Sequence, residues 1–192
     1  MTLKSKFPVQ KKSLSLRLVK YSRGDATDLA LASMLVSAKS GESVLGGWMG
    51  LTAPHFKDLM RRHFPGLKPP LGVRKKTQRM TLRSLEWEDL QKLLLSHRAG
   101  HRITERYIAD IVCSACLGLD HLWQDLGLLN RHQLSLLMEQ NFPTLAQQNN
   151  KGMKWKKFLY KQLCNSKGAY VCRAPSCEEC LEYDICFGPE DE

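Results

Sequence analysis

The chain has 192 residues, of which 43% are hydrophobic and 25% charged, as expected for one globular domain with at most a small appendage. It carries a net charge of +10 at pH 7 and has no apolar run of about 18 residues, which excludes a membrane-spanning helix. No apolar segment follows the basic N-terminus, so we expect no signal peptide and a reducing, cytoplasmic location. Seven cysteines, an odd number, do not suit a closed disulfide framework, and such cysteines usually serve as thiols, metal ligands or catalysts.

Helical signals dominate the chain after its first residues. Residues 1–24 hold seven Lys or Arg and no acidic residue, which predicts a flexible, solvated basic arm. We expect a helical domain over residues 25–165, interrupted by a basic, Pro- and Gly-rich loop at 65–80. Caps and apolar periodicity predict helices at about 25–38 (capped by Asp25), 52–63 (Thr52), 84–96 (Ser84), 103–117, 121–126, 130–140 (Asn130) and 153–164.

No stretch alternates as a β-strand does, so the predicted fold class is all-α, a helical bundle followed by an irregular tail. One internal repeat stands out, because residues 56–67 resemble residues 134–145 at an offset of 78. A Trp followed by Gly-Leu precedes each copy, as Trp48 before Gly50 and Trp123 before Gly127. Duplicated helical hairpins about a pseudo-twofold axis would explain the repeat. Chance similarity between two amphipathic helices is the alternative.

The most specific pattern lies in the C-terminal segment, residues 166–192. Cys172, Cys177, Cys180 and Cys186 are separated by four, two and five residues. Thiolates held this close by a folded loop can converge on one soft metal centre. A domain of this size can fold without a metal, so we expect the cluster to serve function, with a local staple of the tail as the alternative.

Asymmetric spacing with a single two-residue gap favours an iron–sulfur cluster, in which each iron is bound by one thiolate. Two alternatives stay open. One is a zinc site, although zinc prefers paired Cys-x2-Cys or Cys/His ligands, and the other is that the cysteines are free thiols. Residues 172–192 contain seven acidic residues and one basic one, a net charge of −6, so the rest of the chain carries +16. That basic remainder supports a rival function, a zinc-stapled module that binds nucleic acid, although the acidic tail argues against it. A structural adaptor whose metal only folds the tail is a third possibility.

Other candidate residues carry weaker signals. Cys113 and Cys116 fall in an apolar helical pattern and are expected to be buried structural cysteines. Cys164 is a candidate spare ligand, and His121 is more typical of a core or surface histidine than of a ligand. No nucleophile elbow, HExxH motif or phosphate-binding glycine loop occurs, so we expect a carrier and not an enzyme.

Lysines are expected to cover one side of the predicted 153–164 helix, opposite its apolar residues. Lys154, Lys157 and Lys161 share this side. The side is either an ordinary solvated surface or one that attracts an anionic partner or an inorganic oxyanion.

Several stretches resemble the NifQ family. The Cys-x4-Cys-x2-Cys-x5-Cys tail is the hallmark of that family, and residues 154–164, 170–177 and 186–190 around it match as well. Residues 121–128 (HLWQDLGL) resemble the family's central motif, and residues 50–51 and 63–66 resemble its N-terminal half. The resemblance covers about residues 28–190.

The resemblance implies a role in nitrogen fixation, as an iron–sulfur protein that donates molybdenum during assembly of the nitrogenase iron–molybdenum cofactor. It implies that Cys172, Cys177, Cys180 and Cys186 bind an iron–sulfur cluster, expected to be of the 4Fe–4S type, together with molybdenum. The implied partners are the cofactor scaffold complex and the nitrogenase iron protein, and the cargo would be molybdate or a molybdenum–sulfur species. No membrane or nucleic-acid partner is expected.

Overall fold

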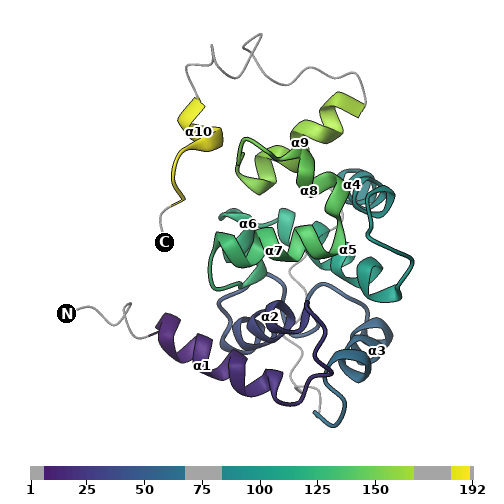
Figure 1. The fold of residues 1–192 in the computed structure, drawn as a ribbon, viewed down its shortest axis with the longest axis vertical. Coiled ribbons are helices and arrows are strands. Elements are labelled where there is room, and N and C mark those ends of the chain that lie inside the picture. The colour runs from purple at the N-terminus through teal and green to yellow at the C-terminus, as the bar shows by residue number, and fades with distance from the viewer. Residues whose placement is uncertain (1–6, 68–83, 167–182, 191–192) are drawn as a thin grey trace, which may run out of the picture.

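The computed structural model describes residues 7–67, 84–166 and 183–190, and every regular element in these ranges is a helix (Figure 1). The all-α prediction is therefore confirmed for the described part of the chain. The helices are α1 (Phe7–Val19), α2 (Asp28–Ser40), α3 (Ala53–His63), α4 (Ser84–Ser96), α5 (Ile103–Cys116), α6 (Leu122–Leu126), α7 (Arg131–Asn141), α8 (Pro143–Gln148), α9 (Trp155–Ser166) and α10 (Tyr183–Phe187).

Helices α2 and α5 form the centre of the core. Both are apolar over most of their surface, and Leu31, Met34, Ile108 and Ile111 are fully buried. In Figure 1, α1, α2 and α3 occupy the lower part of the molecule, α5, α6 and α7 cross the middle, and α8 and α9 lie above them. None of the described helices combines the length and the apolar character that crossing a membrane requires.

The predicted caps at two helix starts are confirmed. The Thr52 side chain accepts a hydrogen bond from the backbone N–H of His55 (3.4 Å), and Pro54 lies in the first turn of α3. The Asn130 side chain accepts from the backbone N–H of Gln133 (2.9 Å) at the start of α7. These polar side chains satisfy backbone donors that have no partner within the first helical turn.

The predicted start of α2 was wrong by three residues. Asp25 lies in the turn before the helix, where its carboxylate accepts from the Thr27 backbone N–H (2.9 Å). The Asp25 backbone N–H in turn donates to the Asp28 carboxylate (2.8 Å), so α2 begins at Asp28. An Asx turn thus competes with helix capping for the same aspartate.

The described part of the N-terminal segment contains a helix that the sequence analysis missed. We expected a solvated basic arm, but α1 covers residues 7–19 and packs along α2. Ser15 of α1 is fully buried, and the Lys11 ammonium donates to the Leu128 carbonyl (3.2 Å). Tertiary contact therefore stabilises a helix whose own amphipathic signal is weak.

The internal repeat corresponds to a repeat in structure. Thr52 and Asn130, which cap α3 and α7, lie 78 residues apart, as do the residues that end these helices, Phe64 and Phe142. The backbone at Phe64 (φ −130°, ψ 64°) is nearly the same as at Phe142 (φ −137°, ψ 57°). Both phenylalanines are buried and both precede a proline. Shared geometry at both helix ends favours duplication over chance similarity.

Two glycines extend the repeat to α2 and α5, because each meets a serine from the other half. A Cβ atom on Gly50 would lie 2.5 Å from Cβ of Ser114 in α5, and one on Gly127 would lie 2.4 Å from Cβ of Ser37 in α2. The two glycines are 77 residues apart, and so are the two serines. Such a reciprocal contact is what a pseudo-twofold axis between the halves produces.

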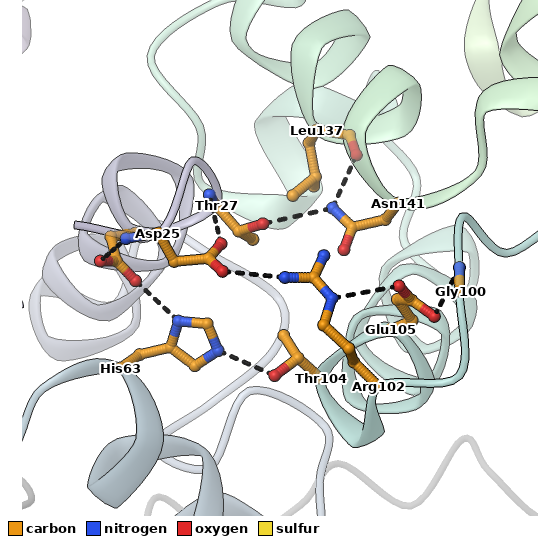
Figure 2. A network of polar contacts seen from close by, with 10 residues as sticks. Asp25, Thr27, His63, Gly100, Arg102, Thr104, Glu105, Leu137 and Asn141 are labelled. Atoms are coloured by element: carbon orange, nitrogen blue, oxygen red, sulfur yellow. Dashed lines mark hydrogen bonds and ion pairs between the residues drawn. The ribbon is translucent and has the colours of Figure 1, made fainter. Parts of the chain in front are cut away.

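Polar contacts cross the same axis (Figure 2). The Asn141 amide of the second half donates to the Thr27 hydroxyl of the first (3.5 Å). His63 of the first half contacts Thr104 of the second, with 3.0 Å between Nε2 and Oγ1. Thr27 and Thr104 are 77 residues apart, and His63 and Asn141 are 78 apart. The two halves therefore exchange equivalent contacts at the starts of α2 and α5.

One ion pair joins residues that are themselves equivalent. Arg102 NH1 lies 3.0 Å from Asp25 Oδ2, and these residues are 77 apart. The pair therefore spans the pseudo-twofold axis, and Figure 2 shows it at the middle of the network.

Substituting the two interface glycines tests the duplication. Gly50→Ala and Gly127→Ala should each lower the free energy of unfolding by about 2–4 kcal/mol, because a left-handed backbone and a close serine both oppose a Cβ atom. Gly152→Ala is the matched control, since Gly152 also has a positive φ (+68°) but no atom within 4 Å of an added Cβ. It should cost only about 1 kcal/mol. Urea unfolding measures all three, and equal costs would contradict the reciprocal contact.

Candidate metal centre

The structure describes one of the four predicted cysteine ligands. Cys186 lies in α10 and is half-buried, whereas Cys172, Cys177 and Cys180 lie outside the described residues. The predicted convergence of the four thiols on one metal therefore stays a prediction.

The segment that carries Cys186 is bound to the helical body. The backbone N–H of Lys154, just before α9, donates to the Cys186 carbonyl (2.8 Å), and the Lys154 ammonium donates to the Asp184 carbonyl (3.2 Å). Cys186 and Phe187 also pack against the apolar core, and the Phe187 ring stacks on Tyr183 with centroids 4.4 Å apart. The last cysteine of the motif thus has a defined place beside the start of α9.

Glu190 adds a charged anchor four residues later. Its side chain is only 6% exposed, and Oε1 lies 3.4 Å from Arg131 NH1 and 3.7 Å from His121 Nδ1. Arg131 is itself held by the Met153 carbonyl (3.0 Å). Burial of a carboxylate is unfavourable without a compensating cation, and Arg131 supplies that cation at Oε1, so Arg131 anchors the end of the tail while His121 lies beside it. His121, whose role the sequence left open, is therefore part of the tail's docking site.

Helix α9 leads from the body into the cysteine tail, and a buried ion pair holds it. The Lys156 ammonium binds the carboxylate of Asp125 and donates to the carbonyls of Asp120 (2.6 Å) and Gly118 (3.1 Å). Burial raises the pKa of Asp125, and the hydrogen bond from Lys156 opposes that rise. Gly118 makes room for the pair, since a Cβ there would lie 2.3 Å from Cγ of Asp125.

The apolar side of α9 is buried as predicted, by Trp155, Phe158, Leu159 and Leu163. On the predicted lysine side, Lys157 is exposed and Lys154 contacts the tail. The lysine that matters most for packing, Lys156, was not assigned a role from the sequence. Its partner Asp125 is 31 residues away, so no local pattern identifies the pair.

Cys113 and Cys116 are buried in α5, as expected. Burial raises the pKa of both thiols, that of Cys116 to about 12. Only the thiolate is a good nucleophile or metal ligand, so neither cysteine is poised for metal chemistry. Cys164, half-buried near the end of α9, stays a candidate spare ligand.

Sequence reasoning missed one further group of potential ligands among the described residues. Single side-chain atoms of Asp25, Asp28 and His63 all lie within 4.8 Å of one another. Each is already engaged, because His63 Nδ1 donates to Asp28 Oδ1 (2.6 Å), its Nε2 contacts Thr104, and Asp25 pairs with Arg102 (Figure 2). The three side chains therefore already have polar partners in the network between the halves, without a metal.

Comparison with known proteins gives a consistent result. The family model named NifQ matches residues 30–188. Protein NifQ of Azotobacter vinelandii is 44% identical over 175 residues, which cover 86% of this chain and 90% of the relative. Protein NifQ of Klebsiella pneumoniae is 38% identical (72% and 85% coverage), and a NifQ homolog of Sinorhizobium fredii is 38% identical (82% and 68%). No solved structure matches the chain.

Removing the charge of Glu190 tests the docking of the tail. In Glu190→Gln, the amide no longer balances Arg131, so the C-terminal segment should detach more often. The Lys154 amide, whose hydrogen bond to Cys186 depends on docking, should then exchange with solvent about fivefold faster, for a loss of roughly 1 kcal/mol. Hydrogen-exchange NMR measures this rate. Glu139→Gln, at an exposed position of α7, is the control, and an unchanged Lys154 rate in Glu190→Gln would refute the anchor.

Alkylation tests the inertness of the α5 thiols. In metal-free native protein at pH 8, Cys113 and Cys116 should not react with iodoacetamide, because burial both shields the sulfurs and keeps them protonated. Both should react once urea unfolds the chain. Peptide mass spectrometry gives the labelled fraction at each cysteine. Rapid native labelling of either one would show that α5 opens and exposes its thiols.

Proposed function

Because the chain belongs to the NifQ family, we propose that it takes part in assembly of the nitrogenase iron–molybdenum cofactor, as an iron–sulfur protein that carries molybdenum and donates it. The observation that carries this proposal is the cysteine motif. All four cysteines, at positions 172, 177, 180 and 186, fall inside the region that matches the family.

The chemistry of the donor set suits an iron–sulfur cluster of the 4Fe–4S type. Cys172, Cys177, Cys180 and Cys186 would hold the cluster, one thiolate to each iron. When bound, the cluster supplies soft sulfide ligands, which suit molybdenum once its hard oxygen ligands have been replaced by sulfur. The half-buried Cys186 fits this role, since its backbone carbonyl is hydrogen-bonded to the body through Lys154.

The charges around the docked segment support an anionic cargo. Arg131 and Lys154 contact the segment that bears Cys186. Lys157 is exposed in α9. Positive side chains near the site would attract molybdate or a molybdenum–sulfur anion by long-range electrostatics. They would also offset the negative charge of a thiolate-bound cluster.

A carrier must release its cargo without unfolding. The buried core is built from α2 to α9, whereas the cysteine motif follows α9 in the chain and its last residues contact the body through Glu190 and the backbone around Cys186. Transfer would therefore disturb the tail and leave the core packed. The proposed recipients are the cofactor scaffold complex and the nitrogenase iron protein, and we propose no catalytic turnover by this chain. The comparisons give no support to the alternative of a zinc-stapled nucleic-acid module.

Substituting a central cysteine tests the proposed function. Protein purified without oxygen should contain iron, sulfide and molybdenum, and Cys177→Ala should lose most of the iron and molybdenum because one thiolate is missing. Its far-UV circular dichroism should stay near that of the parent, since the helical core lies elsewhere. Elemental analysis and circular dichroism provide the two measurements.

Ser176→Ala, at the neighbouring position, is the matched control and should keep both metals. Zinc as the only metal, or no metal at all, would refute the carrier proposal. Loss of helical signal in Cys177→Ala would indicate instead that the metal staples the fold.

A further inference from the structure

Lys154 joins the docked C-terminal segment to the body at two points. Its backbone N–H donates to the Cys186 carbonyl (2.8 Å), and its ammonium donates to the Asp184 carbonyl (3.2 Å). Cys186 is the one candidate ligand of the tail motif that lies within the described residues. A single lysine is therefore bonded both to that ligand residue and to the helical turn that carries it.

The turn that carries Cys186 is closed at the same carbonyl that the ammonium of Lys154 binds. The Asp184 carbonyl accepts a second hydrogen bond from the Gly188 backbone N–H (2.8 Å). Only a glycine allows this approach, since a Cβ atom at position 188 would lie 2.5 Å from the Asp184 oxygen. Residues 184–188 thus form a tight turn, with Cys186 at its middle and Lys154 attached to it twice.

Lys154 can serve as a fixed point because the chain on either side of it is fixed. Met153 and Trp155 are buried, with 6% and 4% exposure. The Met153 carbonyl accepts from the Arg131 guanidinium (3.0 Å) and from the Asn149 amide (2.9 Å). The position of the lysine is therefore set by the helical body and not by the tail.

From these contacts we propose that Lys154 is a positioning residue of the metal centre, which acts through Cys186. Its two hydrogen bonds set where the last thiol of the motif stands relative to the body. The inference rests on the proposed function, because it gives Lys154 a role toward the cluster that the cysteines hold. It goes beyond electrostatic attraction of an anionic cargo, since the ammonium is bonded to a carbonyl of the turn that carries the ligand.

The expected consequence is slower loss of the iron that Cys186 binds. Groups that orient a metal ligand from outside the coordination sphere typically change metal affinity about 10–100-fold when they are removed. Without the ammonium, the Asp184 carbonyl keeps only its bond from Gly188, and the turn is less firmly attached to the body. The Cys186 thiolate would then leave its iron more often.

Three variants of the full-length protein, loaded with iron and sulfide in the absence of oxygen, test the inference. Lys154→Met removes the ammonium and keeps a side chain of similar length, so it should release iron to a chelator about tenfold faster than the parent. Lys154→Arg keeps a donor and a positive charge, so it should release iron at nearly the parent rate. Lys57→Met removes the same charge at an exposed position of α3, far from α10 in Figure 1, and should match the parent.

A fourth variant separates position from charge. Gly188→Ala leaves Lys154 in place but brings a Cβ atom against the Asp184 carbonyl, so it should also accelerate iron release. Visible circular dichroism reports how the thiolates are arranged around iron. This spectrum should change in Lys154→Met and Gly188→Ala and stay unchanged in Lys154→Arg and Lys57→Met, while far-UV circular dichroism verifies that all four are folded.

A measurement on metal-free protein shows whether the tether itself is present. The amide of residue 154 should exchange with solvent about fivefold faster in Lys154→Met than in Lys154→Arg, because loss of one hydrogen bond lets the segment detach more often.

The outcomes distinguish this inference from the proposed function. A parent protein that binds no iron overturns the proposed function, and the role of Lys154 toward the cluster falls with it. With iron bound to the parent, four results overturn the inference alone. Lys154→Met releases iron like the parent, Lys57→Met releases it as fast as Lys154→Met, Lys154→Arg fails to restore the parent rate, or Gly188→Ala has no effect.

Discussion

The exchange of polar contacts at the starts of α2 and α5 is the constraint on which the two-part architecture depends. Thr27 meets Asn141, Thr104 meets His63, and the Asp25–Arg102 ion pair lies between them. Thr27, Thr104, His63 and Asn141 are buried, so each would lower stability if its partner were absent. The two halves can therefore associate in one register, with the end of α3 placed against the start of α5 and the end of α7 against the start of α2. Asp28 strengthens this arrangement by accepting a short hydrogen bond from His63 and fixing the orientation of the ring.

Asymmetry outside this interface distinguishes the two halves. The second half is followed by α8, α9 and the cysteine segment, and the first half has no counterpart of them among the described residues. Lys156 fixes α9 through Asp125, and Arg131 fixes the far end of the segment through Glu190, with His121 beside it. The residues between these attachments include all four cysteines of the motif. The segment is therefore attached at both ends, through α9 and through Glu190, and its Cys186 and Phe187 pack against the core.

Local signals predicted some elements well and others poorly. The ends of α3 and α7 were predictable because Thr52 and Asn130 cap them, and because a proline after Phe64 or Phe142 opposes continuation of the helix. The proline after Phe142 is also the reason that α8 was missed. Pro143 occupies the first position of this new helix, where its missing N–H removes no helical hydrogen bond. Helix α1 was missed because its like charges indicate a solvated arm. Its contact with α2 stabilises the helix, and that contact is not visible in the local sequence. Of the candidate site, the sequence identified Cys186, but it did not identify Glu190, Arg131 or Lys156 as the residues that position the segment.

The sequence by itself determined the helical class, and it predicted a possible duplication and a metal-binding tail, because each is written in short-range patterns: caps, periodicity, a repeated block and the spacing of four thiols. The structure then favoured duplication over chance similarity. Only the tertiary structure decided which distant charges meet. The pairs Lys156–Asp125, Arg131–Glu190 and His63–Asp28 are separated by 31, 59 and 35 residues. No local preference encodes such pairs, since their free energy arises when the packing of whole helices removes both partners from water and brings them together.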